Sequence, residues 1–183
     1  MKYDVKKLTL EQKMRLLMGK DCWRLYTADD QLPNMFLSDG PNGLRMIDVE
    51  TNATKKATAM PNISLLSYSW DPELAHLDGA TIADDCIENG ADVLLAPGVN
   101  IKRTPLCGRN FEYFSEDPFL AGTMAKSYIE GVQSKGVGTS LKHYCANNRE
   151  YARLLQRAKW TKERSVKSIC PLLKSRYRQS LGR

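Results

Sequence analysis

The feature that most constrains the fold is a helix followed by a strand, repeated along the chain. Asp71 and Asp117 each precede a proline, and an acid before a proline is typical of the start of a helix. A short apolar segment follows each helix, at 92–96 and at 138–144, and is predicted to be a strand. Because crossover helices connect strands that run in the same direction, this alternation predicts an α/β fold with a parallel sheet.

Two further elements are predicted before this repeat. Thr9 and Gln12 form a capping-box pattern, which predicts a helix with an apolar stripe over residues 10–18. A short strand is predicted at 35–37, and it leads into Asp39 within the turn sequence S-D-G-P.

The positive charge of the chain is concentrated in its last part. The whole sequence carries +6, but residues 151–183 hold ten Lys or Arg and a single acid, Glu163, and therefore carry +9. Residues 1–150 carry −3, the difference between these two values. This mildly acidic body does not predict a nucleic-acid-binding domain, which would have a basic surface of its own.

Several classes of protein are disfavoured by the sequence. No apolar run is long enough to cross a bilayer, and the N-terminus lacks an apolar signal core, so no membrane partner is predicted and a cytoplasmic location is expected. Five widely spaced cysteines favour buried thiols over a disulfide framework. His76 and His143 are the only histidines, so no metal site is expected, and without a phosphate-binding glycine loop no cofactor is expected.

Polar side chains fall at equivalent places in the predicted repeat. Asp39 follows one strand, the loop that contains Arg109 follows another, and Lys142 and His143 lie at the end of a third. In parallel α/β folds the carboxyl ends of the strands form one face, and binding sites lie on that face. The sequence therefore predicts one pocket in which a carboxylate accepts hydrogen bonds and the Lys, Arg and His side chains donate them.

Each of these residues also has an ordinary structural interpretation. Asp39 could cap a turn, because D-G-P is a good turn sequence. Arg109 could be the ion-pair partner of Glu112 or Glu116, and the Lys142-His143 pair could face solvent. The shared pocket is favoured because all three groups recur at matching positions in the repeat.

Six motifs in this order resemble the N-terminal domain of the family 3 glycoside hydrolases, the β-glucosidase group, from about Leu8 to Tyr151. The motifs are S-D-G-P-N-G-L-R (Ser38–Arg45), A-T-A-M-P-N (Ala57–Asn62), W-D-P-E-L (Trp70–Leu74), V-L-L-A-P-G-V-N-I-K-R (Val93–Arg103), G-R-N-F-E-Y-F-S-E-D-P (Gly108–Pro118) and L-K-H-Y-C-A-N-N (Leu141–Asn148).

The resemblance implies the first half of a (β/α)8 TIM-type barrel and a retaining β-glucosidase activity in the full-length family. It implies that Asp39, Arg109, Lys142 and His143 hold the sugar hydroxyls of a small-molecule or oligosaccharide β-glycoside in the −1 subsite, with Arg45 near the same pocket. Such enzymes need two carboxyl groups about 5–5.5 Å apart. In this family the nucleophile is an aspartate in a later S-D-W-like motif and the acid/base glutamate belongs to a second domain. Neither is present, so no catalytic residue is expected in this chain.

The last residues depart from the family pattern, which divides the chain into residues 1–152 and a basic tail of uncertain structure at 153–183. When codons allowed for Lys159–Lys174 are read two bases later, they can encode V-D-E-R-A-V-G-K-V-Y-L-P-A-F-E, which resembles the family's own continuation. We therefore expect a frame-shifted tail whose charge is an accident of frame.

Three interpretations remain open from the sequence. The first is a β-glucosidase-like fragment that keeps part of the sugar site and is inactive alone. The second is an inactive carbohydrate-binding half-barrel or a non-functional fragment. The third is binding of nucleic acid or an acidic partner through the tail.

Overall fold

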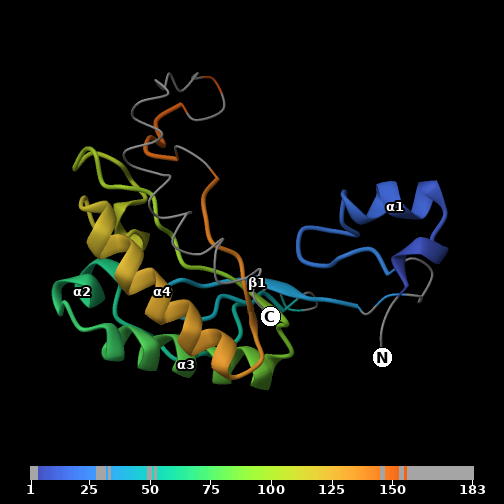
Figure 1. The fold of residues 1–183 in the computed structure, drawn as a ribbon, viewed down its shortest axis with the longest axis horizontal. Coiled ribbons are helices and arrows are strands. Elements are labelled where there is room, and N and C mark those ends of the chain that lie inside the picture. Colours follow the sequence, from blue (N-terminus) through green and yellow to red (C-terminus); the bar gives the residue numbers. More distant parts are fainter. Residues whose placement is uncertain are drawn as a thin grey trace.

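The structure is a computed structural model, and it describes residues 4–27, 32, 34–48, 51, 53–144, 147–152 and 155. A three-stranded parallel sheet lies at its centre, in the order β1-β2-β3. Strand β1 (Leu37–Asp39) pairs in register with β2 (Val93–Leu95), and Leu94 of β2 lies opposite Thr139 of β3 (Gly138–Thr139). The predicted α/β fold with a parallel sheet is confirmed (Figure 1).

The two predicted crossover helices begin where their proline signals place them. Helix α3 (Pro72–Asn89) is capped by Asp71, whose carboxylate accepts hydrogen bonds from two backbone amides of the first turn. Helix α4 (Pro118–Ser134) is capped in the same way by Asp117, which accepts from the amide of Leu120 at 2.7 Å. These caps satisfy amides that have no partner within the helix.

Helices α3 and α4 lie side by side over the sheet and approach each other closely at two glycines (Figure 1). A Cβ on Gly79 would lie 2.1 Å from the carbonyl oxygen of Tyr128, and one on Gly131 would lie 2.0 Å from that of His76. No side chain fits at these distances, so both positions require glycine.

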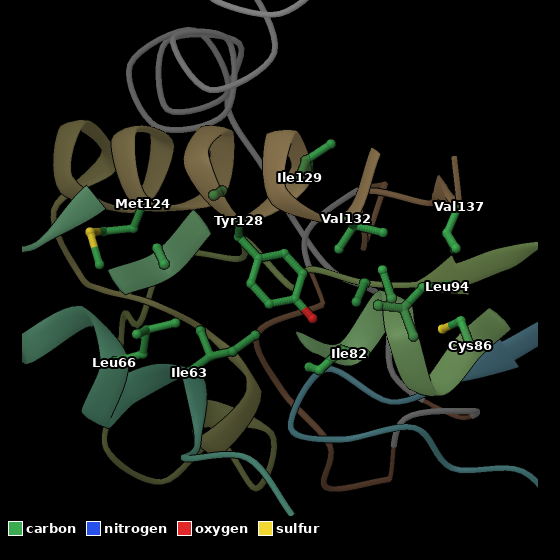
Figure 2. Packing of buried hydrophobic residues seen from close by; sticks show 14 of the residues in the cluster. Ile63, Leu66, Ile82, Cys86, Leu94, Met124, Tyr128, Ile129, Val132 and Val137 are labelled. Atoms are coloured by element: carbon green, nitrogen blue, oxygen red, sulfur yellow. The ribbon is translucent and has the colours of Figure 1, made fainter. Parts of the chain in front are cut away.

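A single apolar core fills the space between these helices, the short helix α2 (Ile63–Tyr68) and the sheet. Tyr128 extends from α4 toward Ile63 of α2 and Ile82 of α3 (Figure 2), and all three side chains are fully buried. Leu94 of β2 is also fully buried, whereas its strand neighbours Val93 and Leu95 are half-buried, so the helix-facing side of the sheet is the better covered one.

The N-terminal helix differs from its prediction. Helix α1 (Leu10–Leu16) begins with the predicted capping box between Thr9 and Gln12, after a short 3-10 helix η1 (Val5–Lys7). The predicted apolar stripe is not packed, because its members are exposed. The sequence pattern therefore predicted the helix correctly, but among the described residues nothing packs against its apolar stripe.

Other predictions were correct only in part. The first strand begins two residues later than predicted, and β3 is shorter than the predicted 138–144.

Cys86 and Cys107 are buried as expected, but Cys22 is exposed, so the prediction was wrong for that thiol. The remaining two cysteines, the segment predicted to be frame-shifted and nearly all of 153–183 lie outside the described residues. No helix in the described part is long and apolar enough to cross a membrane.

Candidate functional site

Asp39 stands at the carboxyl end of β1, where the chain turns back on itself. Gly40 adopts a φ of +143°, and a Cβ there would lie 2.2 Å from the carbonyl oxygen of Gly43, so the turn needs a residue without a side chain. After the turn, the amide of Arg45 donates to the carbonyl oxygen of Asp39 at 2.8 Å. The motif S-D-G-P-N-G therefore fixes the position of the Asp39 carboxylate at the edge of the sheet.

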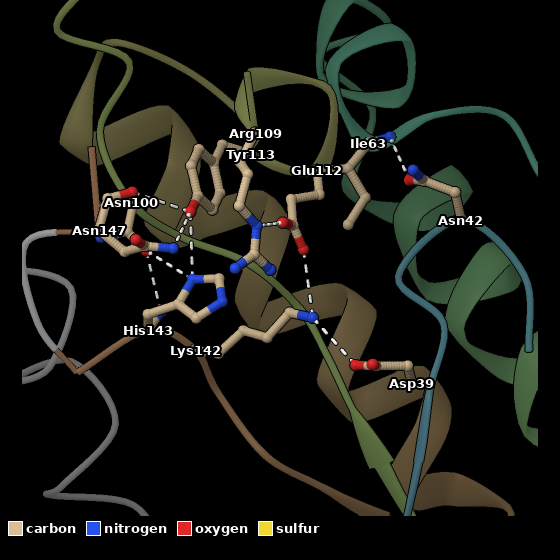
Figure 3. A network of polar contacts seen from close by, with 10 residues as sticks. All are labelled: Asp39, Asn42, Ile63, Asn100, Arg109, Glu112, Tyr113, Lys142, His143 and Asn147. Carbon is tan, nitrogen blue, oxygen red and sulfur yellow. Dashed lines mark hydrogen bonds and ion pairs between the residues drawn. The ribbon is translucent and has the colours of Figure 1, made fainter. Parts of the chain in front are cut away.

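Arg109 is held by an acid from its own loop. It precedes the short 3-10 helix η2 (Asn110–Glu112), and its Nε donates to Oε1 of Glu112 (Figure 3). The Glu112 side chain is 3% exposed, and Nζ of Lys142 lies 3.2 Å from its second carboxylate oxygen. One buried carboxylate thus binds two cations, which is the arrangement that offsets the cost of burying a charge.

Lys142 connects this carboxylate to Asp39. Its amide donates to the carbonyl of Pro97 at 3.1 Å, and the amide of Val99 donates to the Lys142 carbonyl at 2.8 Å, so the backbone is held beside the loop after β2. Its Nζ lies 3.4 Å from Oδ1 of Asp39. The lysine side chain is 14% exposed and that of Asp39 is 38% exposed, so the cluster opens to solvent on the Asp39 side.

His143 is oriented by Asn100 and Tyr113. The backbone amide of His143 donates to Asn100 Oδ1 at 2.9 Å, which identifies that atom as an acceptor. The ring Nδ1 lies 3.1 Å from the same oxygen, so we assign the proton to Nδ1 and leave Nε2 as the acceptor nitrogen. The Tyr113 hydroxyl lies 3.1 Å from Nδ1 and donates to the Asn147 carbonyl at 3.0 Å.

The histidine is neutral at physiological pH. Burial lowers the pKa of His143 to about 4, and the positive charges of Arg109 and Lys142 act in the same direction. The sequence predicted a hydrogen-bond donor at this place, but a neutral ring with its proton on Nδ1 offers an acceptor at Nε2 instead. A ligand hydroxyl could therefore donate to it.

A second set of contacts connects helix α2 to the same loop. Lys102 Nζ donates to Ser64 Oγ at 2.6 Å, and that hydroxyl lies 3.1 Å from the carbonyl oxygens of both Asn110 and Tyr113. Burial lowers the pKa of Lys102. These bonds attach the loop that carries the site residues to the helical layer.

The structure brings together four of the five predicted site residues: Asp39, Arg109, Lys142 and His143. Arg45 is adjacent to Asp39 through its backbone, but its exposed side chain is outside the network drawn in Figure 3. Arg109 does pair with Glu112, as its structural interpretation predicted, and the shared pocket stays a prediction.

Two roles were missed in the sequence, those of Asn100 and Tyr113 around His143. Both lie inside the motifs that flank the loop, and that position was the only available signal. In the described part of the chain no group of three His, Cys, Asp or Glu could hold a metal ion.

Comparison with known proteins assigns a family to this arrangement. The model of the "Glycosyl hydrolase family 3 N terminal domain" matches residues 30–152. An exo-α-(1→6)-L-arabinopyranosidase of Bifidobacterium longum is 50% identical over 157 residues, which are 82% of this chain and 21% of that protein. A thermostable β-glucosidase B of Acetivibrio thermocellus is 46% identical over 156 residues, with the same two shares.

Solved structures give the same result. A β-glucosidase of Bifidobacterium adolescentis matches with a TM-score of 0.84 and 46% identity, over 93% of this chain and 24% of that one. β-Glucosidase 3B of Thermotoga neapolitana, solved with α-D-glucose, matches with a TM-score of 0.72 and 42% identity, over 79% and 23%. The chain therefore spans about a fifth of the length of the curated relatives it matches.

Proposed function

The chain belongs to glycoside hydrolase family 3, and from this premise we propose that it supplies the sugar-holding half of a retaining β-glucosidase site. The proposal depends on one observation above all, the convergence of Asp39, Arg109, Lys142 and His143 at the carboxyl ends of the strands. In this proposal the four side chains bind the hydroxyls of a β-glycoside in the −1 subsite, and Arg45 lies at its rim.

The chemistry of the four groups fits a polyhydroxylated ligand. Arg109 and Lys142 donate hydrogen bonds, the Asp39 carboxylate accepts them, and neutral His143 accepts through Nε2. Such a mixture matches hydroxyl groups, each of which both donates and accepts. Bound glucose in the solved relatives from Thermotoga neapolitana and Kluyveromyces marxianus supports the same ligand class.

The fold also fits part of a larger barrel. A (β/α)8 barrel has eight parallel strands, each followed by a helix. Here β1, β2 and β3 follow in sequence order, with α3 and α4 in the crossovers. We infer that these strands open the family's barrel and that β1 and β3 pair with further strands in a full-length protein.

We infer that the residues that hydrolyse the glycosidic bond lie outside this chain. Glu112 is engaged by two cations and is 2% exposed, and Asp39 faces Lys142, so neither carboxylate is free to attack or protonate a glycosidic bond. We expect no turnover of a nitrophenyl β-glucoside by this chain alone. Measurable turnover by the purified protein would overturn that expectation.

An inactive carbohydrate-binding half-barrel is the second candidate. It is favoured because the four-residue cluster is assembled within the described residues, without any group from the rest of a full-length protein. On this proposal the chain binds glucose by itself. The two candidates share the ligand. In the first, the chain is part of a catalytic site that the rest of a full-length protein completes, and in the second it only binds sugar.

Titration calorimetry with glucose and gluconolactone tests the proposal. We expect binding by the wild type, a loss of about 30-fold for Arg109→Ala, since a hydrogen bond to a charged group contributes about 2 kcal/mol, and no change for the surface control Lys135→Ala. No binding by a folded wild-type chain would contradict the proposal.

The division at residue 152 and the frame-shifted tail stay predictions, as does a cytoplasmic location. The family match ends at residue 152, which supports the division. The nucleotide sequence tests the frame shift: a single-base change near codon 154 should restore the family sequence. Steeply salt-dependent binding of nucleic acid, lost on removal of the tail, would instead favour the third interpretation.

A further inference from the structure

Glu112 is the buried anion on which the cationic side of the site is built. Its side chain is only 3% exposed, and each carboxylate oxygen faces a different cation, Arg109 at Oε1 and Lys142 at Oε2 (Figure 3). Its backbone packs closely against Gly98, where a Cβ would lie 2.5 Å from the Glu112 carbonyl oxygen. The carboxylate therefore has little freedom to leave either cation.

Within the ion pairs of this cluster the charges are balanced, and Glu150 adds a further negative charge that acts on Arg109 from outside these pairs. Arg109 and Lys142 contribute two positive charges, and Glu112 and Asp39 contribute two negative charges in ion pairs with them. Burial alone would raise the pKa of Glu112, but hydrogen bonds and charges from the two cations outweigh it and hold that pKa below its usual value. His143 is neutral, because its pKa is lowered to about 4.

We propose that Glu112 determines specificity by cancelling the positive charge of Arg109 and Lys142, so that the site selects neutral sugars over sugar acids. The inference rests on the proposed sugar-binding function. With Glu112 in place, the two cations offer directed N–H donors to hydroxyls without presenting a net positive field. Without it, a positive charge in a partly buried site would attract the carboxylate of a uronic acid.

Glu112 also acts as a positioning residue. The guanidinium and the ammonium are held by one buried carboxylate, and the ammonium also reaches Asp39 on the open side of the cluster. Preorganised donors bind a ligand without losing side-chain entropy at the moment of binding. Removal of the charge should therefore loosen Lys142 as well as change the selectivity of the site.

The test compares glucose with glucuronate by titration calorimetry at low and high salt. The wild type is expected to bind glucose at least tenfold more tightly than glucuronate. Glu112→Gln keeps the size of the side chain and removes its charge, and it should shift the ratio toward glucuronate by about tenfold at low salt, less at high salt. Glu116→Gln, an exposed change in the same segment, is the control and should shift nothing.

The wild type alone can overturn the inference: glucuronate bound as tightly as glucose would contradict it even if Glu112→Gln failed to fold. An unchanged ratio in folded Glu112→Gln would also contradict it.

A second measurement is independent of sugar binding. In folded Glu112→Gln, Lys142 should react faster with acetic anhydride at pH 8, relative to Lys135, because its ammonium has lost a partner. If the wild type bound neither sugar, the proposed function would fail, and unchanged Lys142 reactivity would separately refute the positioning role.

Discussion

The apolar core and the polar site share strand β2, but they differ in whether their buried polar groups have hydrogen-bond partners. In the core, side chains reach full burial, and the hydroxyl of Tyr128 and Oδ2 of Asp78 have no hydrogen-bond partner among the described residues. In the site, Glu112 and Tyr113 are equally buried, yet each is bonded to neighbouring polar groups.

This difference separates stability from binding. The stability of the core depends on close packing. Its buried polar atoms therefore contribute little to the free energy of unfolding, and the glycines at the helix crossing contribute much. The site depends on the direction of a few hydrogen bonds and charges, and it stays partly open to solvent at Asp39 and Arg109. Changes in the core should therefore alter the free energy of unfolding, and changes in the site should chiefly alter sugar affinity.

The largest expected effect is on the helix crossing of the core. Gly131→Ala places a Cβ 2.0 Å from the His76 carbonyl oxygen, so the two helices must move apart. We expect a loss of about 3 kcal/mol in the free energy of unfolding, measured by urea denaturation. Gly136→Ala is the control: it has open space but a φ of +85°, and it should cost about 1 kcal/mol. Equal effects of the two changes would refute the close crossing.

Asp39→Asn should have the opposite effect, because it should change glucose affinity more than stability. The Asp39 side chain is 38% exposed and its ion pair with Lys142 is long at 3.4 Å, so its loss should change the unfolding free energy by less than about 1 kcal/mol. Glucose affinity should fall by about tenfold or more, because a charged acceptor for a hydroxyl is gone. A large loss of stability with unchanged affinity would show that Asp39 is a structural group.

The two buried tyrosines form a matched pair of tests. Tyr128→Phe removes a hydroxyl that has no hydrogen-bond partner in the described part of the chain, and it should leave the unfolding free energy unchanged or raise it by up to about 1 kcal/mol, with sugar affinity unchanged. Tyr113→Phe removes the bonds to His143 and Asn147, and it should lower stability by about 1 kcal/mol and glucose affinity several-fold. Similar outcomes for both would erase the distinction between the regions.

The smallest expected net effect is that of two pH dependences of opposite sign, which largely cancel in the wild type. Burial raises the pKa of Asp78 to about 7, so this group contributes stability that is complete at low pH and is lost as the pH rises from about 4 to 7. The pKa of His143 is lowered to about 4, so its contribution is complete above pH 6.5 and is lost as the pH falls toward 4.

Two variants separate these contributions. In Asp78→Asn, unfolding measured across pH 4 to 7 should show stability falling on acidification more than in the wild type. In His143→Gln it should fall less or rise. If neither variant changed the pH profile, the stated pKa directions would be wrong.

Local signals in the sequence predicted the elements that depend on local chemistry. Asp71 and Asp117 cap their helices through neighbouring amides, so each start could be located without knowing the fold. The sequence did not indicate that the stripe on α1 would be exposed or that α2 would form, because both depend on packing partners. The edges of β1 and β3 were misplaced for the same reason.

For the site, the sequence predicted which residues come together but not how they are bonded to one another. Equivalent positions after successive strands brought Asp39, Arg109, Lys142 and His143 together, as the repeat implied. The tautomer of His143 was not predictable, because it depends on Asn100, which lies 43 residues away in the chain. Nor could the sequence show that Glu112 binds two cations, since Lys142 approaches it only in the folded chain.

The most direct test of the central claim is where glucose binds on this chain. Titration of glucose into 15N-labelled protein, followed by NMR, should shift the amide signals of Asp39, Asn100, Lys142 and His143 and leave those of Tyr128 and Val132 in the core unchanged. Saturable shifts confined to the first set would agree with a sugar held at the carboxyl ends of the strands. No shifts from folded protein, or shifts that avoid these four residues, would contradict it.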